Sequence, residues 1–186
     1  GQMMEKVILP DQRPRRTDEE VAKQCPWALT GRKGGRKQNK VFTLEFDSEK
    51  MEQNNLRFQE TYKKIAENEV RVEMIGTDDC DYLLIAFGSL ARVCQKVREL
   101  AAEDGVKVGI IRPITLWPFP YKEIAQAAQN AKGIMVAELN AGQMIEDVKL
   151  AVKSDEMPII HYGRMGGIVP NPEEVYEALK AKLINK

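Results

Sequence analysis

A glycine-rich segment near the C-terminal end has the residue types needed to hold an anionic ligand. The sequence GRMGG at Gly163–Gly167 combines three glycines with Arg164. Glycine allows unusual backbone angles and close approach of a ligand, and arginine binds a carboxylate or a phosphate through two parallel hydrogen bonds. A contact between subunits is the other interpretation of Gly163, Arg164, Gly166 and Gly167. Both interpretations stay open, and we favour the subunit contact.

A second polar segment, ELNAGQ, ends an apolar run. Glu138 has the chemistry of a general base, but a single carboxylate without a partner group favours a structural or interface role. Asn140 and Gln143 offer hydrogen-bond donors beside it. His161, the only histidine of the chain, lies in an apolar run. We therefore expect it to be a core or interface residue rather than a catalytic one.

Gly88–Ser89 follows another apolar run at the expected start of a helix. Backbone N–H groups at a helix start favour an anion such as phosphate, yet the GxGxxG spacing of a dinucleotide loop is absent. A tight turn, with Ser89 as the helix cap, is the interpretation we favour. The chain also lacks GxSxG, P-loop and HExxH motifs. The residues alone therefore predict no catalytic residues in this chain.

The segment RPITLWPFP at Arg112–Pro120 places Trp117 and Phe119 among three prolines. Large aromatic side chains are unfavourable in water, and proline stiffens the backbone. One hypothesis is a preorganised wedge that presents both rings to another subunit, because aromatic anchors are typical of interfaces. The alternative is that these rings cover the core of their own domain.

Composition excludes several classes of protein. The 186 residues are enough for one domain with an extension, and 28 basic residues balance 28 acidic ones, so no overall nucleic-acid footprint is indicated. Three cysteines without CxxC spacing, and one histidine, argue against an iron–sulfur or zinc site built by this chain alone. Sparse, unpaired thiols fit a reducing, cytoplasmic environment. No apolar run is long enough to predict a membrane span.

From Asp81 onward, short apolar runs alternate with helical patterns. Four strands are expected at Tyr82–Gly88, Val106–Ile111, Gly133–Leu139 and Met157–Tyr162. Helical patterns follow each strand, with inward stripes formed by Leu90, Cys94, Val97 and Ala101, by residues of Tyr121–Ala131, by Met144, Ile145, Val148, Ala151 and Val152, and by Val175, Leu179 and Leu183 of Pro172–Ile184. Repeated βα units predict a three-layer α/β/α domain with a mostly parallel sheet. The polar loops described above would then share the carboxyl-end edge of the sheet, where ligands gather.

The N-terminal part follows a different pattern. Residues 1–48 are expected to form an irregular arm, residues 49–76 a linking helix with an extended segment, and residues 77–186 the α/β domain. Ser48 is the expected cap of the linking helix. Within the arm, Cys25–Gly31 is typical of a segment that docks on a surface. Gly31–Lys40 carries five basic residues, which we interpret as a solvated loop, with contact to phosphate or an acidic partner as the alternative.

Several of these segments together resemble a known family. The segments RPITLWPFP, AELNAGQMIEDVKLAV and HYGRMGGIVPNPEEV are similar to the alpha subunit of 2-oxoacid:ferredoxin oxidoreductases, most closely the 2-ketoisovalerate type. The segments CPWALTGRKGG and LRFQETYKKIAENEVRVE resemble the stretch that joins the two domains of that subunit. The resemblance covers about Pro10 to Ile184. It departs from the family pattern at Leu139, Ala141 and Cys80.

This resemblance implies a function that the residues alone do not. Such enzymes oxidatively decarboxylate a 2-oxoacid on thiamine diphosphate, transfer the acyl group to coenzyme A and pass electrons through iron–sulfur clusters to ferredoxin. The chain matches the domain that is like the transketolase C-terminal domain. The implied partners are the beta (thiamine-diphosphate) subunit and the gamma and iron–sulfur subunits, with ferredoxin contacted indirectly. Thiamine diphosphate, magnesium and the clusters would be bound elsewhere in that complex, and none by this chain.

Two other functions remain as alternatives. One is a thiamine enzyme that does not use ferredoxin, similar to transketolase or pyruvate dehydrogenase, against which the combination of RPITLWPFP and GRMGG argues. The other is a binding module without enzymatic function that uses its basic arm to hold nucleic acid. We expect neither nucleic acid nor membrane as a partner.

Overall fold

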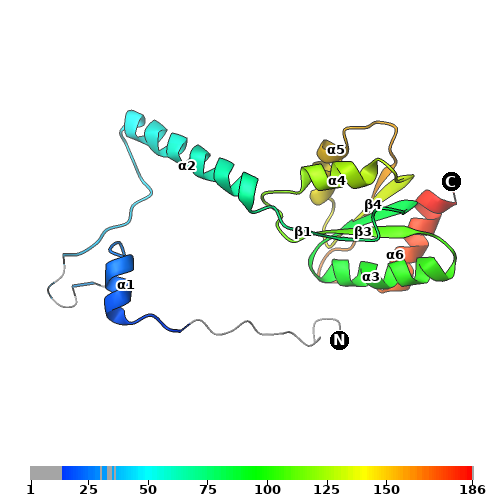
Figure 1. Cartoon of the computed structure of the whole chain (residues 1–186), viewed down its shortest axis with the longest axis horizontal. Helices are drawn as coiled ribbons and strands as arrows, with labels where there is room; N and C mark the ends of the chain where they lie inside the picture. The colour runs from blue at the N-terminus through cyan, green and yellow to red at the C-terminus, as the bar shows by residue number, and fades with distance from the viewer. Residues whose placement is uncertain (1–13, 30, 33–34, 36, 186) are drawn as a thin grey trace. The chain divides into compact units, whose positions relative to one another are not determined.

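The computed structural model describes residues 14–29, 31–32, 35 and 37–185. Contacts divide the chain into two units, and the boundary lies between Thr61 and Tyr62, inside one long helix. Each unit is described by itself. The larger unit contains the five-stranded sheet and the helices that cover it (Figure 1).

The sheet has the order β1-β3-β2-β4-β5. Its strands are β1 (Val72–Ile75), β2 (Tyr82–Ala86), β3 (Val108–Pro113), β4 (Gly133–Glu138) and β5 (Ile159–Gly163). β2 pairs in parallel with β3 and β4, and β4 pairs in parallel with β5. β1 runs antiparallel along the other side of β3. The predicted mostly parallel sheet is confirmed, and the extended segment before it becomes its antiparallel edge strand.

Helices cover both faces of the sheet, as predicted for a three-layer domain. α3 (Gly88–Glu103) and α6 (Pro172–Leu179) lie on one face, and α4 (Tyr121–Ala128) and α5 (Met144–Val152) lie on the other (Figure 1). The chain continues from α6 into a π-helical turn, η2 (Lys180–Ile184). The expected final helix is therefore present, but its last turn is wider than an α-helix.

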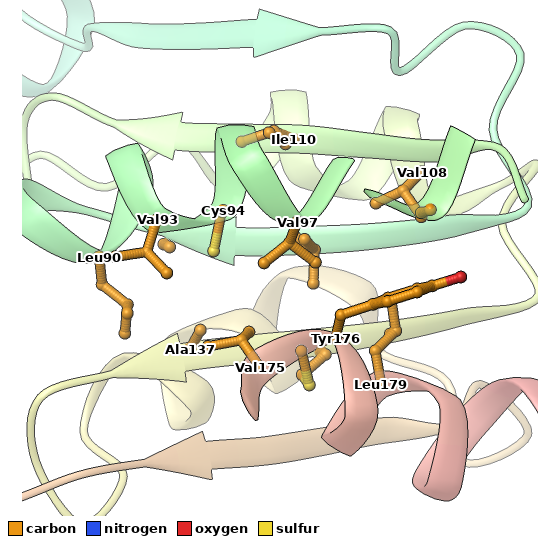
Figure 2. Close-up of a cluster of buried hydrophobic side chains, with 14 of the residues drawn as sticks. Leu90, Val93, Cys94, Val97, Val108, Ile110, Ala137, Val175, Tyr176 and Leu179 are labelled. Carbon is orange, nitrogen blue, oxygen red and sulfur yellow. The ribbon is translucent and has the colours of Figure 1, made fainter. Parts of the chain in front are cut away.

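The core has one buried cluster on each face of the sheet. The cluster under α3 and α6 includes Leu90, Cys94, Val97, Val175 and Leu179, which point toward the strands (Figure 2). Ala101 and Leu183 also belong to this cluster. These inward residues agree with the predicted helix stripes, because residues spaced three or four apart share one face of a helix.

The cluster on the opposite face packs α4 and α5 against the sheet. It is formed by Leu83, Ile85, Ile111, Ile124, Ile134, Val136, Met144, Ile145, Val148 and Ala151, among others. Val152, which was predicted to face inward, is only partly buried at the end of α5. Strands β2 and β4 are buried on both sides, which explains their continuous apolar sequences.

Several predicted ends are wrong by a few residues. β3 begins at Val108 and not at Val106, and α4 ends at Ala128 and not at Ala131. Ser89 is not the cap of α3, because the helix begins at Gly88 and its N-cap is Phe87, which makes no side-chain capping bond.

The unit that ends at Thr61 contains α1 (Asp18–Gln24) and the first part of α2 (Ser48–Asn68). α1 was not predicted within the irregular arm, although Thr17 and Glu20 form a capping box that starts it. α2 was predicted, but its cap is Asp47 and not Ser48. The Asp47 carboxylate accepts hydrogen bonds from the backbone N–H groups of Glu49 and Lys50 at 3.1 and 3.3 Å.

Candidate functional site at the carboxyl ends of the strands

The loops that follow the parallel strands meet at one edge of the sheet, which we call the carboxyl-end rim. β2 and β4 are neighbours, and the chain leads from β2 to β3 on one side of this pair and from β4 to β5 on the other. Ligands of open α/β folds bind at such a point. A cavity of about 150 Å³ lies there, lined by Phe87, Leu116, Phe119, Glu138, Asn140, Gln143, Met144 and Asp147. Two of the loops selected from the sequence, Arg112–Pro120 and the ELNAGQ segment, thus contribute to one cavity, and Phe87 lies next to a third, Gly88–Ser89.

The two aromatic side chains of Arg112–Pro120 have different environments. Phe119 is 7% exposed and belongs to the core, whereas Trp117 is 59% exposed. The predicted exposed wedge is therefore wrong for Phe119. The ring of Trp117 meets the ring of Tyr62 edge to face, with 5.5 Å between centroids.

The loop around these rings is fixed by hydrogen bonds. The backbone N–H groups of Ile114 and Thr115 donate to the carbonyl of Arg71 at 2.9 and 3.1 Å. The Thr115 hydroxyl donates to the carbonyl of Pro118 at 3.0 Å and accepts from the N–H of Arg71 at 3.0 Å. Trp117 is thus held in a defined position at the surface, which lowers the entropy lost on docking.

Glu138 is fully engaged at the start of α5. Its carboxylate accepts hydrogen bonds from the backbone N–H groups of Gln143, Met144 and Ile145 at 3.2, 2.8 and 3.1 Å. The side chain is buried. A carboxylate at a helix N-terminus satisfies donors that have no partner within the helix. This structural role explains the burial of Glu138.

Asn140 and Gln143 shape the loop that follows β4. The Asn140 Oδ1 atom accepts a hydrogen bond from the N–H of Gly142 at 2.7 Å. The side chains of both residues line the cavity. Together they leave an amide-rich wall beside the apolar side chains of Leu116 and Phe119.

The ring of His161 lies close to two of the rim loops, at Gly142 and Gly163. Its Nε2 atom lies 3.8 Å from Oε1 of Glu138 and has no hydrogen-bond partner among the described residues. A Cβ atom at Gly163 would overlap the His161 ring and the carbonyl oxygen of Asn140. Gly163 is therefore required by this close approach, while His161 is partly buried in a supporting position.

Arg164 points to the surface of its own domain. Its guanidinium forms an ion pair with Glu174 of α6 at 3.2 Å, and its backbone N–H donates to the carbonyl of Glu138. Gly166 and Gly167 have positive φ angles of 70° and 85° and open space around them. Neither Arg164 nor these glycines line the cavity, so the predicted rim residues divide into a cavity group and an outer loop.

The two ends of the sheet differ in surface chemistry. Exposed apolar side chains gather in the loops after β3, β4 and β5, namely Ile114, Leu116, Trp117, Leu139, Met165, Ile168 and Val169. None of the exposed large hydrophobic side chains of the described residues lies in the loops that precede β2, β3, β4 and β5. Ion pairs occupy that end instead, with Lys107–Asp79 at 2.6 Å and Lys132–Asp81 at 2.7 Å. Among the loops at the two ends of the parallel strands, exposed large apolar side chains are thus found only at the carboxyl-end rim.

Two of the three thiols, those of Cys80 and Cys94, are unsuited to bind a cluster or to act as nucleophiles. Cys80 and Cys94 belong to the buried clusters on opposite faces of the sheet. Burial raises the pKa of Cys94 to about 12 and also raises the pKa of Cys80. Among the described residues, no three His, Cys, Asp or Glu side chains are grouped to hold a metal ion. No helix in this part of the chain has the length and apolarity to span a membrane.

Comparisons with known proteins identify the family of this domain. Residues 80–175 match the family model for pyruvate:ferredoxin oxidoreductase core domain II. The match covers every strand of the parallel part of the sheet and the rim loops. The chain belongs to the pyruvate:ferredoxin oxidoreductase core domain II family. The resemblance to 2-oxoacid:ferredoxin oxidoreductases is confirmed at this level.

A sequence relative extends the likeness beyond the core domain. Ketoisovalerate oxidoreductase subunit VorB of Methanothermobacter thermautotrophicus is 34% identical over 170 residues, covering 90% of this chain and 47% of the relative. The chain thus spans about half the length of this relative.

Two solved structures share the fold. The 2-oxoglutarate:ferredoxin oxidoreductase from Magnetococcus marinus superposes with a TM-score of 0.62 at 19% identity, covering 84% of this chain and 30% of that one. A split-gene transketolase gives a TM-score of 0.52 at 13% identity, covering 61% and 41%. The predicted transketolase C-terminal-like fold is confirmed.

Sequence reasoning missed part of the rim. Leu116, Ile114 and Met165 were not selected, because isolated apolar residues in loops are common on protein surfaces. The contact between Tyr62 and Trp117 was not predicted either. Their positions could have identified them, because Ile114, Leu116 and Met165 each lie within a few residues of the carboxyl end of a strand.

Proposed function

We propose that this chain is the C-terminal domain of the alpha subunit of a 2-oxoacid:ferredoxin oxidoreductase that depends on thiamine diphosphate. The holoenzyme would oxidatively decarboxylate a 2-oxoacid, form an acyl-coenzyme A and pass the electrons to ferredoxin. In that complex the domain would serve assembly and form surroundings of the active site. The observation that carries this role is the apolar carboxyl-end rim, which contrasts with the ion-paired opposite edge.

The rim has the features of a subunit contact. Trp117 is exposed on a loop that hydrogen bonds fix to Arg71, and tryptophan is enriched among the residues that dominate binding energy. Ile114 and Leu116 of the same loop are also exposed and would exclude water around it. A fixed aromatic anchor within an apolar surround supports docking of another subunit.

The side chains here do not fit the cofactors of such a complex. Magnesium with a diphosphate needs several oxygen ligands, and the described residues offer no such group. A cluster needs several thiolates, whereas Cys80 and Cys94 are buried on opposite faces. Glu138 is occupied by three backbone N–H groups. The proposal therefore assigns thiamine diphosphate, magnesium and the iron–sulfur clusters to other parts of the complex.

The proposed substrate is 2-ketoisovalerate or a related branched-chain 2-oxoacid. Support comes from the VorB relative, whose match covers 90% of this chain. The proposed partners are the beta, gamma and iron–sulfur subunits in the cytoplasm, with ferredoxin reached through them. 2-Oxoglutarate is the alternative substrate, because one of the solved structures that superpose on this chain is a 2-oxoglutarate:ferredoxin oxidoreductase.

Affinity purification of the tagged chain from its own cells, followed by mass spectrometry and activity assays, tests the proposal. We expect a thiamine-diphosphate-binding subunit and a cysteine-rich subunit to co-purify. The purified complex should reduce ferredoxin with 2-ketoisovalerate and coenzyme A, faster than with pyruvate or 2-oxoglutarate. The chain alone should be inactive.

Two results would contradict parts of this proposal separately. A complex that reduces ferredoxin only with 2-oxoglutarate overturns the substrate and leaves the domain assignment in place. Turnover by the chain alone, or micromolar binding of thiamine diphosphate to it in calorimetry, overturns the non-catalytic role.

A further inference from the structure

The cavity at the carboxyl-end rim has the size of one long side chain. Its volume is about 150 Å³, which equals that of roughly five water molecules. Pockets for drug-sized ligands usually enclose about 300–1,000 Å³. Phe87, Leu116, Phe119 and Met144 supply the apolar part of its lining. A side chain with an apolar stem therefore suits this space better than a free small molecule does.

The polar lining of this cavity carries negative charge. It consists of the carboxylates of Glu138 and Asp147 and the side-chain amides of Asn140 and Gln143, and no basic side chain of the described residues contributes to it. An anionic occupant is disfavoured, because Glu138 already accepts the three backbone N–H groups at the start of α5. A positively charged occupant is therefore the complementary one.

Asp147 is the carboxylate that an occupant of the cavity can reach. Its Oδ1 atom accepts a hydrogen bond from the Tyr121 hydroxyl at 2.6 Å. In the part of the chain that the structure describes, its Oδ2 atom accepts no hydrogen bond and no cation pairs with it. The neighbouring Glu146 differs, because its carboxylate pairs with Lys149 at 2.8 Å. Asp147 thus has an acceptor oxygen available to a partner from outside the domain.

The distribution of acceptors favours a guanidinium over an ammonium group. The amides of Asn140 and Gln143 lie in the same lining as the Asp147 carboxylate, so acceptor oxygens surround the occupant on more than one side. A guanidinium offers five N–H donors in one plane, whereas an ammonium is a compact and strongly hydrated charge. Phe87 and Phe119 add aromatic rings, on which a guanidinium can stack. An arginine side chain therefore matches both parts of the lining.

A second cavity continues the first along the surface. It encloses about 640 Å³ and shares Leu116, Phe119 and Asp147 with the smaller cavity. Ala66 and Val70 belong to its further apolar lining, and all of its lining residues lie in the unit that contains the sheet. A polypeptide segment that fills the smaller cavity with one side chain can therefore place a neighbouring apolar side chain in the larger one. This continuity favours a protein segment over a free cation.

We propose that the subunit that docks on the carboxyl-end rim inserts an arginine side chain into the smaller cavity, where its guanidinium binds Asp147 and its stem lies against Leu116 and Phe119. A neighbouring apolar side chain of the same segment occupies the larger cavity. The apolar contacts supply affinity, and the charge-assisted pair with Asp147 fixes the orientation of the docked segment. This inference rests on the proposed function, because it names the chemistry of the partner subunit at the rim.

Binding of the purified partner subunits to variants of this chain tests the contact. Asp147→Asn keeps the shape of the side chain and an acceptor for Tyr121, and we expect it to weaken the complex about tenfold or more. The salt dependence of the dissociation constant should also become smaller, because a charge pair is lost. Glu146→Gln is the matched control, since Glu146 is the preceding residue of α5 and lines neither cavity. It should change the dissociation constant less than about twofold.

Chemical footprinting identifies the group that enters the cavity. Phenylglyoxal modifies exposed arginine side chains, and mass spectrometry locates the modified positions. We expect an arginine of the partner that is protected in the wild-type complex and reactive in the Asp147→Asn complex. Replacing that arginine with glutamine should weaken binding to the wild-type chain and have little further effect on binding to Asp147→Asn, as a double-mutant cycle requires for two residues in contact.

The outcomes separate this contact from the proposed function. If no partner subunit binds the wild-type chain, the proposed role in assembly is overturned, and this contact with it. If partner subunits bind the wild-type chain and Asp147→Asn equally, the arginine contact is overturned and the role in assembly stands. Footprinting that finds a lysine, or no basic residue, whose protection depends on Asp147 also overturns it.

Discussion

Two helices of this chain, α3 and α2, carry apolar residues at helical spacing and have opposite environments. α3 has 16 residues, six of which are buried, whereas α2 has 21 residues and none is buried. α3 follows β2 directly and packs back on the sheet, as βα units do. α2 precedes the edge strand β1 and is not the crossover helix of a βα unit. Apolar spacing therefore predicts that a helix needs a partner, and topology decides whether the chain supplies it.

The largest effect should separate two rings of one loop. Phe119→Ala removes a core side chain, and we expect it to lower the free energy of unfolding by about 3–5 kcal/mol. Trp117→Ala should change that free energy by less than about 0.5 kcal/mol but weaken binding of the other subunits about tenfold or more. Urea unfolding of the chain and titration of the assembled complex measure the two quantities. Equal losses of stability would contradict the division between core and contact residue.

A matched pair of leucines tests the two helices directly. Leu90 in α3 is 1% exposed and Leu56 in α2 is 60% exposed. Leu90→Ala should cost about 2–5 kcal/mol of unfolding free energy, because it leaves a cavity. Leu56→Ala should cost less than about 0.5 kcal/mol. The comparison requires urea unfolding at a protein concentration below any self-association, and a large loss in Leu56→Ala would show that α2 is packed within the monomer.

The two carboxylate caps should also differ. Glu138→Ala leaves three backbone N–H groups at the start of α5 unsatisfied, two of them buried, and we expect a loss of about 1–3 kcal/mol. Asp47→Ala removes an exposed cap, which should lower the helicity of α2 in circular dichroism and leave the unfolding of the sheet domain unchanged. Glu138→Gln, which keeps one acceptor oxygen, should lie between wild type and Glu138→Ala. If the wild type, Glu138→Gln and Glu138→Ala had the same free energy of unfolding, the Glu138 carboxylate would not stabilise the rim.

The smallest effect should come from the ion pair at the amino end of the sheet. A hydrogen bond from Lys132 lowers the pKa of Asp81. The stabilisation by the Lys132–Asp81 ion pair is therefore fully present above the pKa that Asp81 has in the unfolded chain. It is lost as the pH falls through the lower pKa that Asp81 has in the folded chain. Asp81→Asn should destabilise slightly at neutral pH and not at all in acid. A larger effect in acid would reverse the sign and refute this assignment.

The sequence predicted the parallel sheet well because its central strands β2, β3 and β4 are buried on both faces. Continuous apolar runs such as Tyr82–Ala86 reflect that burial directly. Strand and helix ends were less certain, because they depend on hydrogen bonds made across the chain. β3, for example, extends to Pro113 because it pairs with Val72 of β1.

The site was predicted in part. The rim loops could be located because the carboxyl ends of parallel strands share one edge. Which loop side chains are buried and which are exposed could not be predicted. Phe119 and Trp117 are only two residues apart and differ in what packs against them. Glu138 was correctly expected to be structural, but its three N–H partners belong to a helix start whose position requires the folded backbone.

The position of His161 has a practical consequence for spectroscopy. It is the only histidine of the chain, and its ring lies against Gly142 and Gly163 in two of the rim loops. Its imidazole protons therefore give isolated nuclear magnetic resonance signals that need no residue-specific labelling. Any molecule that moves either loop will shift those signals, so the chain contains a built-in reporter for occupancy of its rim.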